Sequence, residues 1–361
     1  NRTVNKISTF NPSGKDQILL AEGYLPTDKI TKIDRYLRYF GFLSQSIEDY
    51  VQSDVRGKLE KPANKMYGYI LMLFMWLILI RNVLLAFIED PYLRKYLGET
   101  MPQRPAKQFT MALTIWSGYA ALLSRLYYRA EKYRFNSWVT PFLVFKGFLS
   151  PQSMGLDSPM TDRWFDKTKR RLRNGLVMLN LRWLIGSALF AWVAYMRYSS
   201  RSIPDAFNIL WTILLTIWLY YSSALTYITY AYFRSLCFYF RMRYNKVNND
   251  IESIIDPNNR MKPNERCSTL HHVLIEHNEL CMRITDYNTF WSNYLLYSYF
   301  LIVALICYTT FQAFFTYNLI VVRTMMFILA LECAFLITKI SVSASLLANE
   351  VCTINKHSSN N

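Results

Sequence analysis

A single glutamate, Glu332, lies inside the strongly apolar stretch MFILALECAFLITKI, residues 325–339. An ionisable side chain at mid-bilayer depth costs about 3 kcal/mol, so it normally faces other helices and finds a partner there. At about 1.5 Å per residue, Glu332 lies about 20 Å along the apolar run that starts near Leu319. Arg182, counted from Asn174 at the opposite membrane face, lies about 12 Å deep and reaches the same level. The depths predict an Arg182–Glu332 pair. In the alternative, Glu332 is protonated and hydrogen-bonded, while Arg182 extends to the interface.

Aromatic and small polar side chains occur together in the halves of four apolar runs that the charge pattern below places on the outside. Aromatic walls with a few hydrogen-bonding groups are what a small organic ligand needs. An interfacial aromatic belt produces the same enrichment, so that interpretation stays open. The predicted ligand-binding residues are Trp192, Tyr195, Trp211, Thr212, Tyr308, Thr309, Gln312, Arg323 and Thr324.

Histidines and carboxylates are also concentrated between residues 271 and 279, in the stretch HHVLIEHNE. The spacing of His272 and Glu276 could hold a metal on one helix face, but a solvated helix face explains the cluster more simply. The chain has no GxSxG, P-loop, GxGxxG, HExxH or paired CxxC motif. We therefore expect no enzyme activity, no metal and no cofactor.

The elements that position these residues are long apolar runs. The 361 residues are 52% hydrophobic and 16% aromatic, which is too apolar for a soluble domain with a charged surface. Runs of about 20 apolar residues can each cross a hydrocarbon core of about 30 Å as a helix. The sequence thus predicts an all-α, polytopic transmembrane helical bundle, with the lipid bilayer as its partner. The six predicted spans are 66–88, 108–128, 174–196, 207–233, 288–316 and 319–347.

The net charge of +16 is distributed in alternation along the loops. Lys and Arg number eleven before the first span, ten in 129–173 and eight in 234–287, but only four in 89–107 and two in 197–206. The positive-inside rule then places the N-terminus and the basic loops in the cytosol, and it argues against a nucleic-acid partner. Arg81 and Arg125 lie near span ends, where we expect them to snorkel to the interface.

Three parts flank the spans. Residues 1–65 are expected to be a cytosolic segment with an amphipathic helix over 27–52, which packs beneath the bundle or lies on the membrane. The transmembrane bundle is expected to extend over 66–347. Its fourth helix continues past the membrane, and a second helix returns to the fifth span. Residues 234–287 are therefore expected to form two cytosolic helical extensions, separated by the stretch DPNNRMKPNE. Residues 348–361 are expected to be a cytosolic tail or a truncated linker.

The layout of this region resembles a known family. The fourth helix continues into FYFRMRYNKVNNDIESI, and a second helix, HNELCMRITDYNTFWSNYLLYSYFLIVALICY, leads into the fifth span. This layout, over about residues 210–352, is similar to that of the arthropod gustatory and odorant receptor superfamily. The resemblance implies a seven-helix subunit of inverted topology in the plasma membrane. It further implies a homo- or hetero-tetrameric, ligand-gated cation channel that responds to a small organic tastant or odorant.

The resemblance also implies a seventh, pore-lining helix, with a Thr-Tyr pair, a hydrophobic run and Gln-Phe. Nothing after Glu350 can form such a span, so we expect a chain that lacks this helix and does not conduct alone. A G-protein-coupled receptor is the alternative. Such a receptor has an extracellular N-terminus, a cysteine at the top of the third helix and an NPxxY-like motif near its end, and the sequence indicates none of these three features. A secondary transporter using Arg182 and Glu332 as a coupling pair is the third, although no span contains the Pro that broken transporter helices favour.

Overall fold

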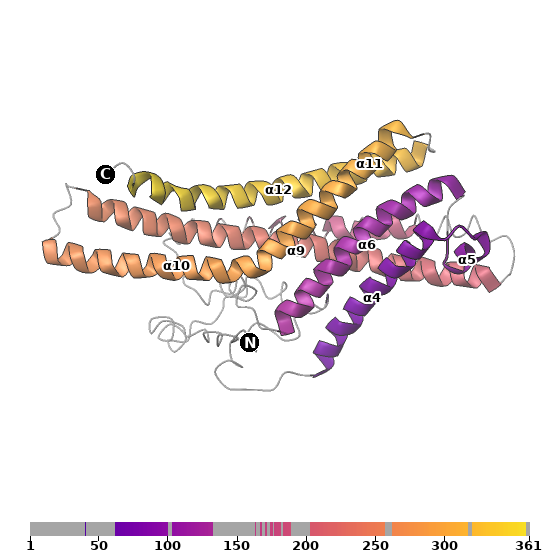
Figure 1. Ribbon diagram of the computed structural model, residues 1–361, viewed down its shortest axis with the longest axis horizontal. Coiled ribbons are helices and arrows are strands. Elements are labelled where there is room, and N and C mark those ends of the chain that lie inside the picture. Colours follow the sequence, from indigo (N-terminus) through magenta and orange to yellow (C-terminus); the bar gives the residue numbers. More distant parts are fainter. Residues whose placement is uncertain are drawn as a thin grey trace.

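The computed structural model describes residues 40, 62–99, 103–132, 203–256, 262–316 and 320–358, together with helical positions 163, 167, 170, 171, 174, 175, 177–181 and 183–188. The regular structure of these residues is entirely helical, which confirms the predicted all-α class for this part of the chain (Figure 1). The helices are α4 (Pro62–Phe87), α5 (Pro91–Tyr96), α6 (Gln103–Lys132), α9 (Ile203–Ile255), α10 (Pro263–Tyr297), the π-helical η4 (Ser298–Ile302), α11 (Val303–Phe315) and α12 (Ile320–Ser358).

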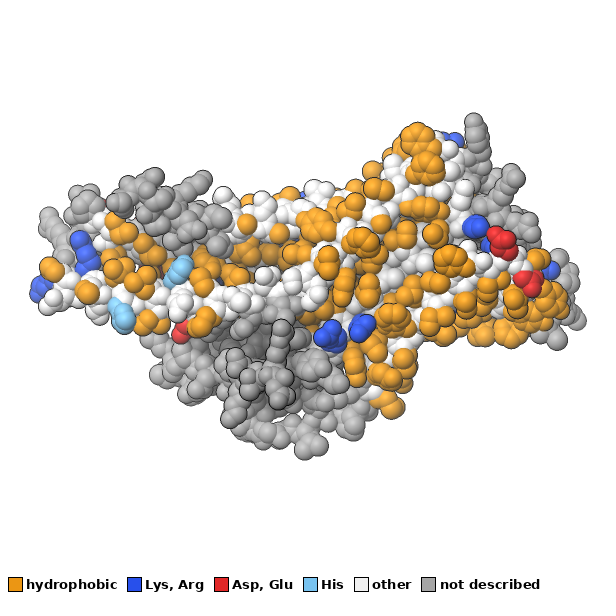
Figure 2. Space-filling view, viewed as in Figure 1, with side chains coloured by type: hydrophobic (Ala, Val, Ile, Leu, Met, Phe, Trp, Pro, Cys, Tyr) orange, Lys and Arg blue, Asp and Glu red, His pale blue; other side chains and the backbone are white. Residues whose placement is uncertain are grey.

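Four of the described helices are long and apolar enough to cross a membrane. The candidate segments are Met66–Phe87, Ala206–Ile255, Phe290–Phe315 and Val322–Asn349. Their outward faces carry many exposed hydrophobic side chains, which are widespread on the face of the molecule that Figure 2 shows. On α4 the exposed side chains recur every three or four residues, as one stripe of a helix does. They are Met66, Ile70, Leu73, Leu77, Ile80, Leu84 and Phe87. A helix that buries little and exposes such a stripe is suited to lipid, and the arrangement is that of a multi-pass membrane protein.

The helix α6 contains the predicted span 108–128 but is not among these four. It packs against α4, α9, α10 and α11, so it is a central helix of the bundle. Ala120, Ala121 and Leu123 are fully buried on it, whereas Arg125 is exposed. Because its neighbours cover so much of α6, it needs fewer apolar side chains than a lipid-facing helix. The predicted span 174–196 lies partly outside the described residues.

One unbroken helix, α9, runs for 53 residues, and α10 returns antiparallel beside it (Figure 1). The α10 helix begins with Pro263 at its first turn, where a missing N–H costs nothing. Arg243 of α9 contacts Glu276 of α10 at 2.9 Å, and Lys246 contacts the same carboxylate at 3.6 Å. These extensions therefore hold together through ion pairs, beside a small apolar cluster of Val247, Ile254 and Val273. The α12 helix packs along α9 and continues past the predicted span end to Ser358.

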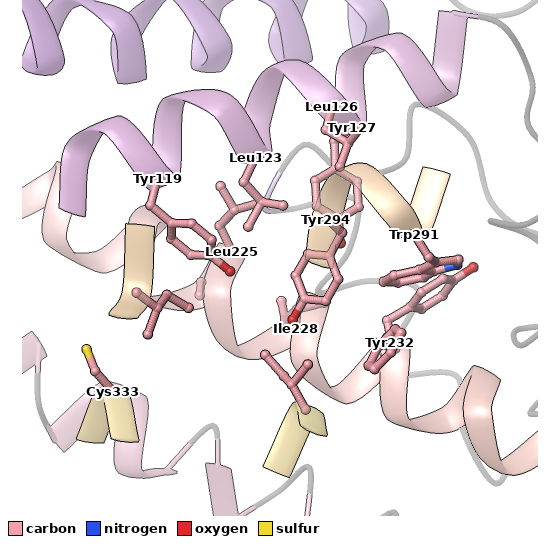
Figure 3. Close-up of a cluster of buried hydrophobic side chains, with 14 of the residues drawn as sticks. Tyr119, Leu123, Leu126, Tyr127, Leu225, Ile228, Tyr232, Trp291, Tyr294 and Cys333 are labelled. Atoms are coloured by element: carbon pink, nitrogen blue, oxygen red, sulfur yellow. The ribbon is translucent and has the colours of Figure 1, made fainter. Parts of the chain in front are cut away.

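Aromatic side chains form the main core where α6, α9 and α10 meet (Figure 3). The Trp291 ring lies 5.7 Å from the Tyr232 ring and 5.3 Å from the Tyr294 ring, centroid to centroid. The Tyr127 hydroxyl on α6 donates to Thr229 Oγ1 on α9 at 2.6 Å. Phe40, the described residue of the predicted amphipathic helix 27–52, is buried against Tyr220 of α9. This core fixes the helices whose other faces line the cavity described below.

Candidate ligand-binding cavity

A cavity of about 800 Å³ lies between α6, α9, α12, the junction of η4 with α11, and the 174–188 segment, defined as the described residues in that range. Small-molecule sites are clefts of about 300–1,000 Å³ with apolar walls and a few polar groups. The lining residues are Ile115, Trp116, Tyr119, Gly175, Met178, Leu179, Ser223, Thr226, Tyr227, Tyr230, Leu301, Ile302, Leu305, Leu331, Glu332, Cys333, Ala334, Phe335, Leu336, Thr338 and Lys339.

The cavity opens to the surface on one side. Three of its large apolar lining residues are more than half exposed: Met178 (58%), Leu331 (54%) and Phe335 (65%). They belong to the 174–188 segment and to α12, so the opening lies between these two elements. An opening rimmed by apolar side chains admits an apolar compound more readily than a polar one.

The inner wall includes α6 and the end of the π-helix, where Leu301 and Ile302 line the cavity. Tyr119 is buried on α6, and its hydroxyl lies 3.4 Å from Ser298 Oγ of η4. Figure 3 shows Tyr119 on the α6 side and Cys333 on α12. This wall thus joins the cavity directly to the aromatic core.

The π-helix η4 interrupts the long helix formed by α10 and α11. Such π turns are rare and occur often at functional sites, because they shift the register of the residues that follow. Leu301 and Ile302 of η4 line the cavity, while the Tyr299 hydroxyl lies 2.7 Å from Ser341 Oγ on α12. A molecule in the cavity therefore contacts η4, which connects α10 to α11 along the chain and contacts α12 through Tyr299.

One face of α12 supplies the charged groups of the cavity. Glu332, Cys333, Leu336 and Lys339 follow the spacing of a single helix face, and all four line the cavity. Glu332 and Lys339 are two turns apart, about 10 Å along the helix axis. The Lys339 ammonium lies 5.2 Å from the centre of the Phe335 ring, a cation–π contact. The cavity thus carries opposite charges at different levels.

Two tyrosines of α9, Tyr227 and Tyr230, form another part of the cavity wall. The Tyr227 hydroxyl donates to the backbone oxygen of Arg171 at 3.0 Å. Gly175 makes this approach possible, because a Cβ at that position would overlap the Tyr227 hydroxyl. A glycine at 175 therefore fixes how closely the 174–188 segment and α9 approach each other.

The predicted ligand-binding residues that the structure describes lie outside this cavity, and their polar groups mostly bond to nearby backbone. Trp211 Nε1 donates to Tyr96 O at 3.0 Å, and the hydroxyls of Thr212, Thr309 and Thr324 each donate to the carbonyl four residues earlier. The Tyr308 hydroxyl donates to Gln108 O at 3.0 Å, and Arg323 Nε to Ala313 O at 2.8 Å. Gln312 is buried on α11. Tyr308, Thr309 and Gln312 share α11, and Arg323 reaches this helix from α12.

Trp192, Tyr195 and Arg182 fall outside the described residues. Of the predicted site residues that the structure describes, Glu332 alone lines the cavity. Glu332 is half-buried and is engaged in an interaction with the protein. The Arg182–Glu332 pair therefore stays a prediction.

Arg81 does not snorkel, and that prediction is wrong. Its side chain is only 4% exposed and donates to Leu97 O at 2.9 Å, to Gly98 O at 2.7 Å and to Asn82 Oδ1 at 2.8 Å. The guanidinium also lies 5.2 Å from the centre of the Trp211 ring. Asn82 Nδ2 in turn donates to Ser117 Oγ on α6 at 3.2 Å. This buried network ties α4, the following loop, α6 and α9 together at one end of the bundle.

A second arginine stabilises the same loop. Arg94 forms a two-pronged ion pair with Glu99, with Nε at 2.8 Å from Oε2, and donates to Ile88 O at 3.0 Å. The hydrogen bonds with Glu99 raise the Arg94 pKa above its ordinary value, so the guanidinium is protonated at any physiological pH. No sequence signal identified these two arginines as loop anchors, because their partners are backbone carbonyls and a residue brought close by the turn.

Comparison with known proteins gives no assignment. The chain matches no protein-family model and no curated protein.

Proposed function

We propose that this chain is a subunit of a chemosensory, gustatory-type receptor of the plasma membrane, in which a small organic ligand promotes opening of a cation pathway. The observation that supports the proposal best is the cavity of about 800 Å³, whose apolar and aromatic walls carry a few convergent polar groups. An interior site of this kind suits an uncharged or amphiphilic organic molecule. The four apolar helices and the resemblance described above support the membrane setting.

The proposed arrangement has six membrane crossings and a cytosolic N-terminus, with related subunits completing a tetramer. The loop after α4 then lies outside the cell, and the far ends of α9 and α10 lie inside. The segments 129–173 and 234–287 carry ten and eight Lys and Arg, against four in 89–107, and the positive-inside rule favours the cytosol for the segments with more of these residues.

The gating step follows from which elements line the cavity. A ligand shifts a closed–open equilibrium only by binding the open state more tightly, by about 1.4 kcal/mol for each tenfold shift. The walls include η4 and α12, which are linked to each other by Tyr299 and Ser341. In the proposal, these two elements change their relative position when the pathway opens.

Voltage-clamp recording tests this proposal. Cells expressing the complete coding sequence are exposed to a panel of small organic compounds, and the variant Cys333→Trp is compared with Leu346→Trp. Cys333 is 7% exposed and lines the cavity, so a tryptophan there fills it; Leu346 is 45% exposed on the same helix and does not line it. We expect a ligand-evoked cation current that is lost in Cys333→Trp and retained in Leu346→Trp.

Other outcomes would replace the proposal. A response that needs GTP turnover favours the G-protein-coupled alternative, and uptake of labelled ligand without channel current favours a transporter. A cation current that is unaffected by Cys333→Trp would show that this cavity is not the site.

A further inference from the structure

Four cations occupy exposed helical positions just before the predicted span 174–196. Successive members are three or four residues apart, which places them on one side of a helix with neighbouring Cβ atoms about 5–6 Å apart. Among the residues that the structure describes, no carboxylate forms an ion pair with any of the four. These residues, called the basic face below, are Arg163, Lys167, Arg170 and Arg171.

The sequence around the basic face supplies little opposite charge. Residues 163–173, RWFDKTKRRLR, contain six Lys or Arg and one carboxylate, Asp166. Like charges three or four residues apart on a helix repel each other. An external anion that contacts several of these cations at once therefore relieves a repulsion that the chain itself leaves largely uncompensated.

The same side of the helical segment becomes apolar where the predicted span begins. After Asn174, the positions that continue the spacing of three and four residues carry apolar side chains that are each more than half exposed. A basic surface followed by an apolar one matches a phospholipid, whose charged head lies at the membrane surface and whose tails lie in the hydrocarbon. The apolar positions are Val177, Met178, Leu181, Leu184 and Ile185.

A contact with α9 places the end of the basic face. The Tyr227 hydroxyl donates to Arg171 O at 3.0 Å, and Gly175 leaves room for the Tyr227 side chain. This hydrogen bond joins residues close to the ends of the predicted spans 174–196 and 207–233, the ends that the proposed topology assigns to the cytosolic side. In that topology the basic face lies at the level of the head groups of the cytosolic leaflet.

We infer that the basic face binds the head group of an anionic phospholipid of the cytosolic leaflet, while the lipid tails lie along the apolar residues from Val177 to Ile185. Phosphate oxygens accept charge-assisted hydrogen bonds from Lys and Arg. The basic face extends over about 12 Å of helix, so a head group with several phosphates contacts more of its cations than a head group with one. The site is separate from the cavity, and the inference shares only the membrane topology with the proposed function.

Equilibrium binding of radiolabelled phosphatidylinositol bisphosphate to the immobilised full chain in neutral detergent tests the inference. Radiolabelled phosphatidylcholine, which has similar tails and no net charge, is the comparison lipid. We expect saturable binding of the bisphosphate lipid, at least about tenfold tighter than that of phosphatidylcholine, because each cation near an anionic lipid surface adds to the attraction.

Lys167→Gln and Arg170→Gln should each weaken binding of the bisphosphate lipid about fivefold, the factor expected for one cation close to anionic lipid. The matched control is Lys262→Gln, which removes an exposed lysine at the N-cap of α10. This control should leave the affinity unchanged. Equal effects of Lys167→Gln and Lys262→Gln would overturn the inference, because any loss of one charge from a chain of net charge +16 would then suffice.

Two other outcomes would also overturn it. Equally tight binding of phosphatidylcholine would show that the head-group charge is not recognised. Displacement of the labelled lipid by soluble inositol trisphosphate, at the concentration at which unlabelled lipid displaces it, would assign the basic face to a soluble phosphate compound.

The binding measurement is independent of channel current, which separates this inference from the proposed function. Selective lipid binding by a chain without any ligand-evoked current would support the inference and refute the channel. A ligand-evoked current that is lost in Cys333→Trp, together with equal binding of the two lipids, would refute the inference alone.

Discussion

Replacing Gly98 by alanine should destabilise the end of the bundle at the loop after α4. Gly98 has a φ of +70°, and a Cβ there would lie 2.6 Å from Trp211 Cβ and 2.8 Å from its Cγ. A non-glycine residue in this left-handed conformation costs about 1–2 kcal/mol. The displaced Trp211 would also lose its 3.0 Å bond to Tyr96 O, about 1 kcal/mol, and its contact with the Arg81 guanidinium, about 0.5–1 kcal/mol. We expect the free energy of unfolding to fall by about 3 kcal/mol.

The same substitution at Gly118 is the matched control. Gly118 lies within α6, and a Cβ there would meet only Leu79 Cδ1 at 3.9 Å, an ordinary contact. Alanine in a helix interior is favoured over glycine by about 1 kcal/mol. Equilibrium unfolding of the purified protein in mixed micelles should therefore show Gly98→Ala less stable and Gly118→Ala at least as stable as the unsubstituted chain. If Gly98→Ala unfolds at the same denaturant concentration as the unsubstituted chain, the reasoning about this loop is refuted.

Two further substitutions test the contacts that hold the helices together. Tyr127→Phe removes the buried 2.6 Å hydrogen bond to Thr229 and should lower the free energy of unfolding by about 1–2 kcal/mol. The control Tyr128→Phe, at a half-buried neighbouring position, should change the free energy of unfolding by less than about 0.5 kcal/mol. Equal effects of the two substitutions would contradict the role of this hydrogen bond. Glu276→Gln breaks the largely buried ion pair with Arg243. Backbone hydrogen exchange should become faster in the paired parts of α9 and α10, while the exchange rates in α4 stay the same. An equal increase of the exchange rate in all helices would argue against a local effect.

The sequence was sufficient for the helical class because its apolar runs are long and uniform. The candidate spans Met66–Phe87, Ala206–Ile255, Phe290–Phe315 and Val322–Asn349 each overlap such a run. Their boundaries were less predictable where tertiary contacts decide them: α12 continues to Ser358 along α9, although its apolar run ends earlier. The π turn at Ser298–Ile302 has no signal in the sequence, since its register depends on what packs around Ser298 and Tyr119.

The site was harder to predict because counting residues along a helix gives depth but not direction. Trp211 and Tyr308 have the residue types of a ligand pocket, yet their polar atoms bond to Tyr96 and Gln108. Glu332 was identified because a carboxylate in an apolar run is conspicuous, and it does line the cavity. Arg81 was expected to reach the interface, but the turn at Gly98 brings two carbonyls to it.

The proposed function depends on which side of the membrane each end of the helices occupies, and cysteine accessibility measures this directly. In a background without the native cysteines, Lys95→Cys and His271→Cys each place one thiol at an exposed position, the former in α5 and the latter in the α10 extension. The proposed topology predicts that a membrane-impermeant maleimide labels Lys95→Cys on intact cells and His271→Cys only after permeabilisation. Labelling of His271→Cys on intact cells, with Lys95→Cys protected, would contradict it.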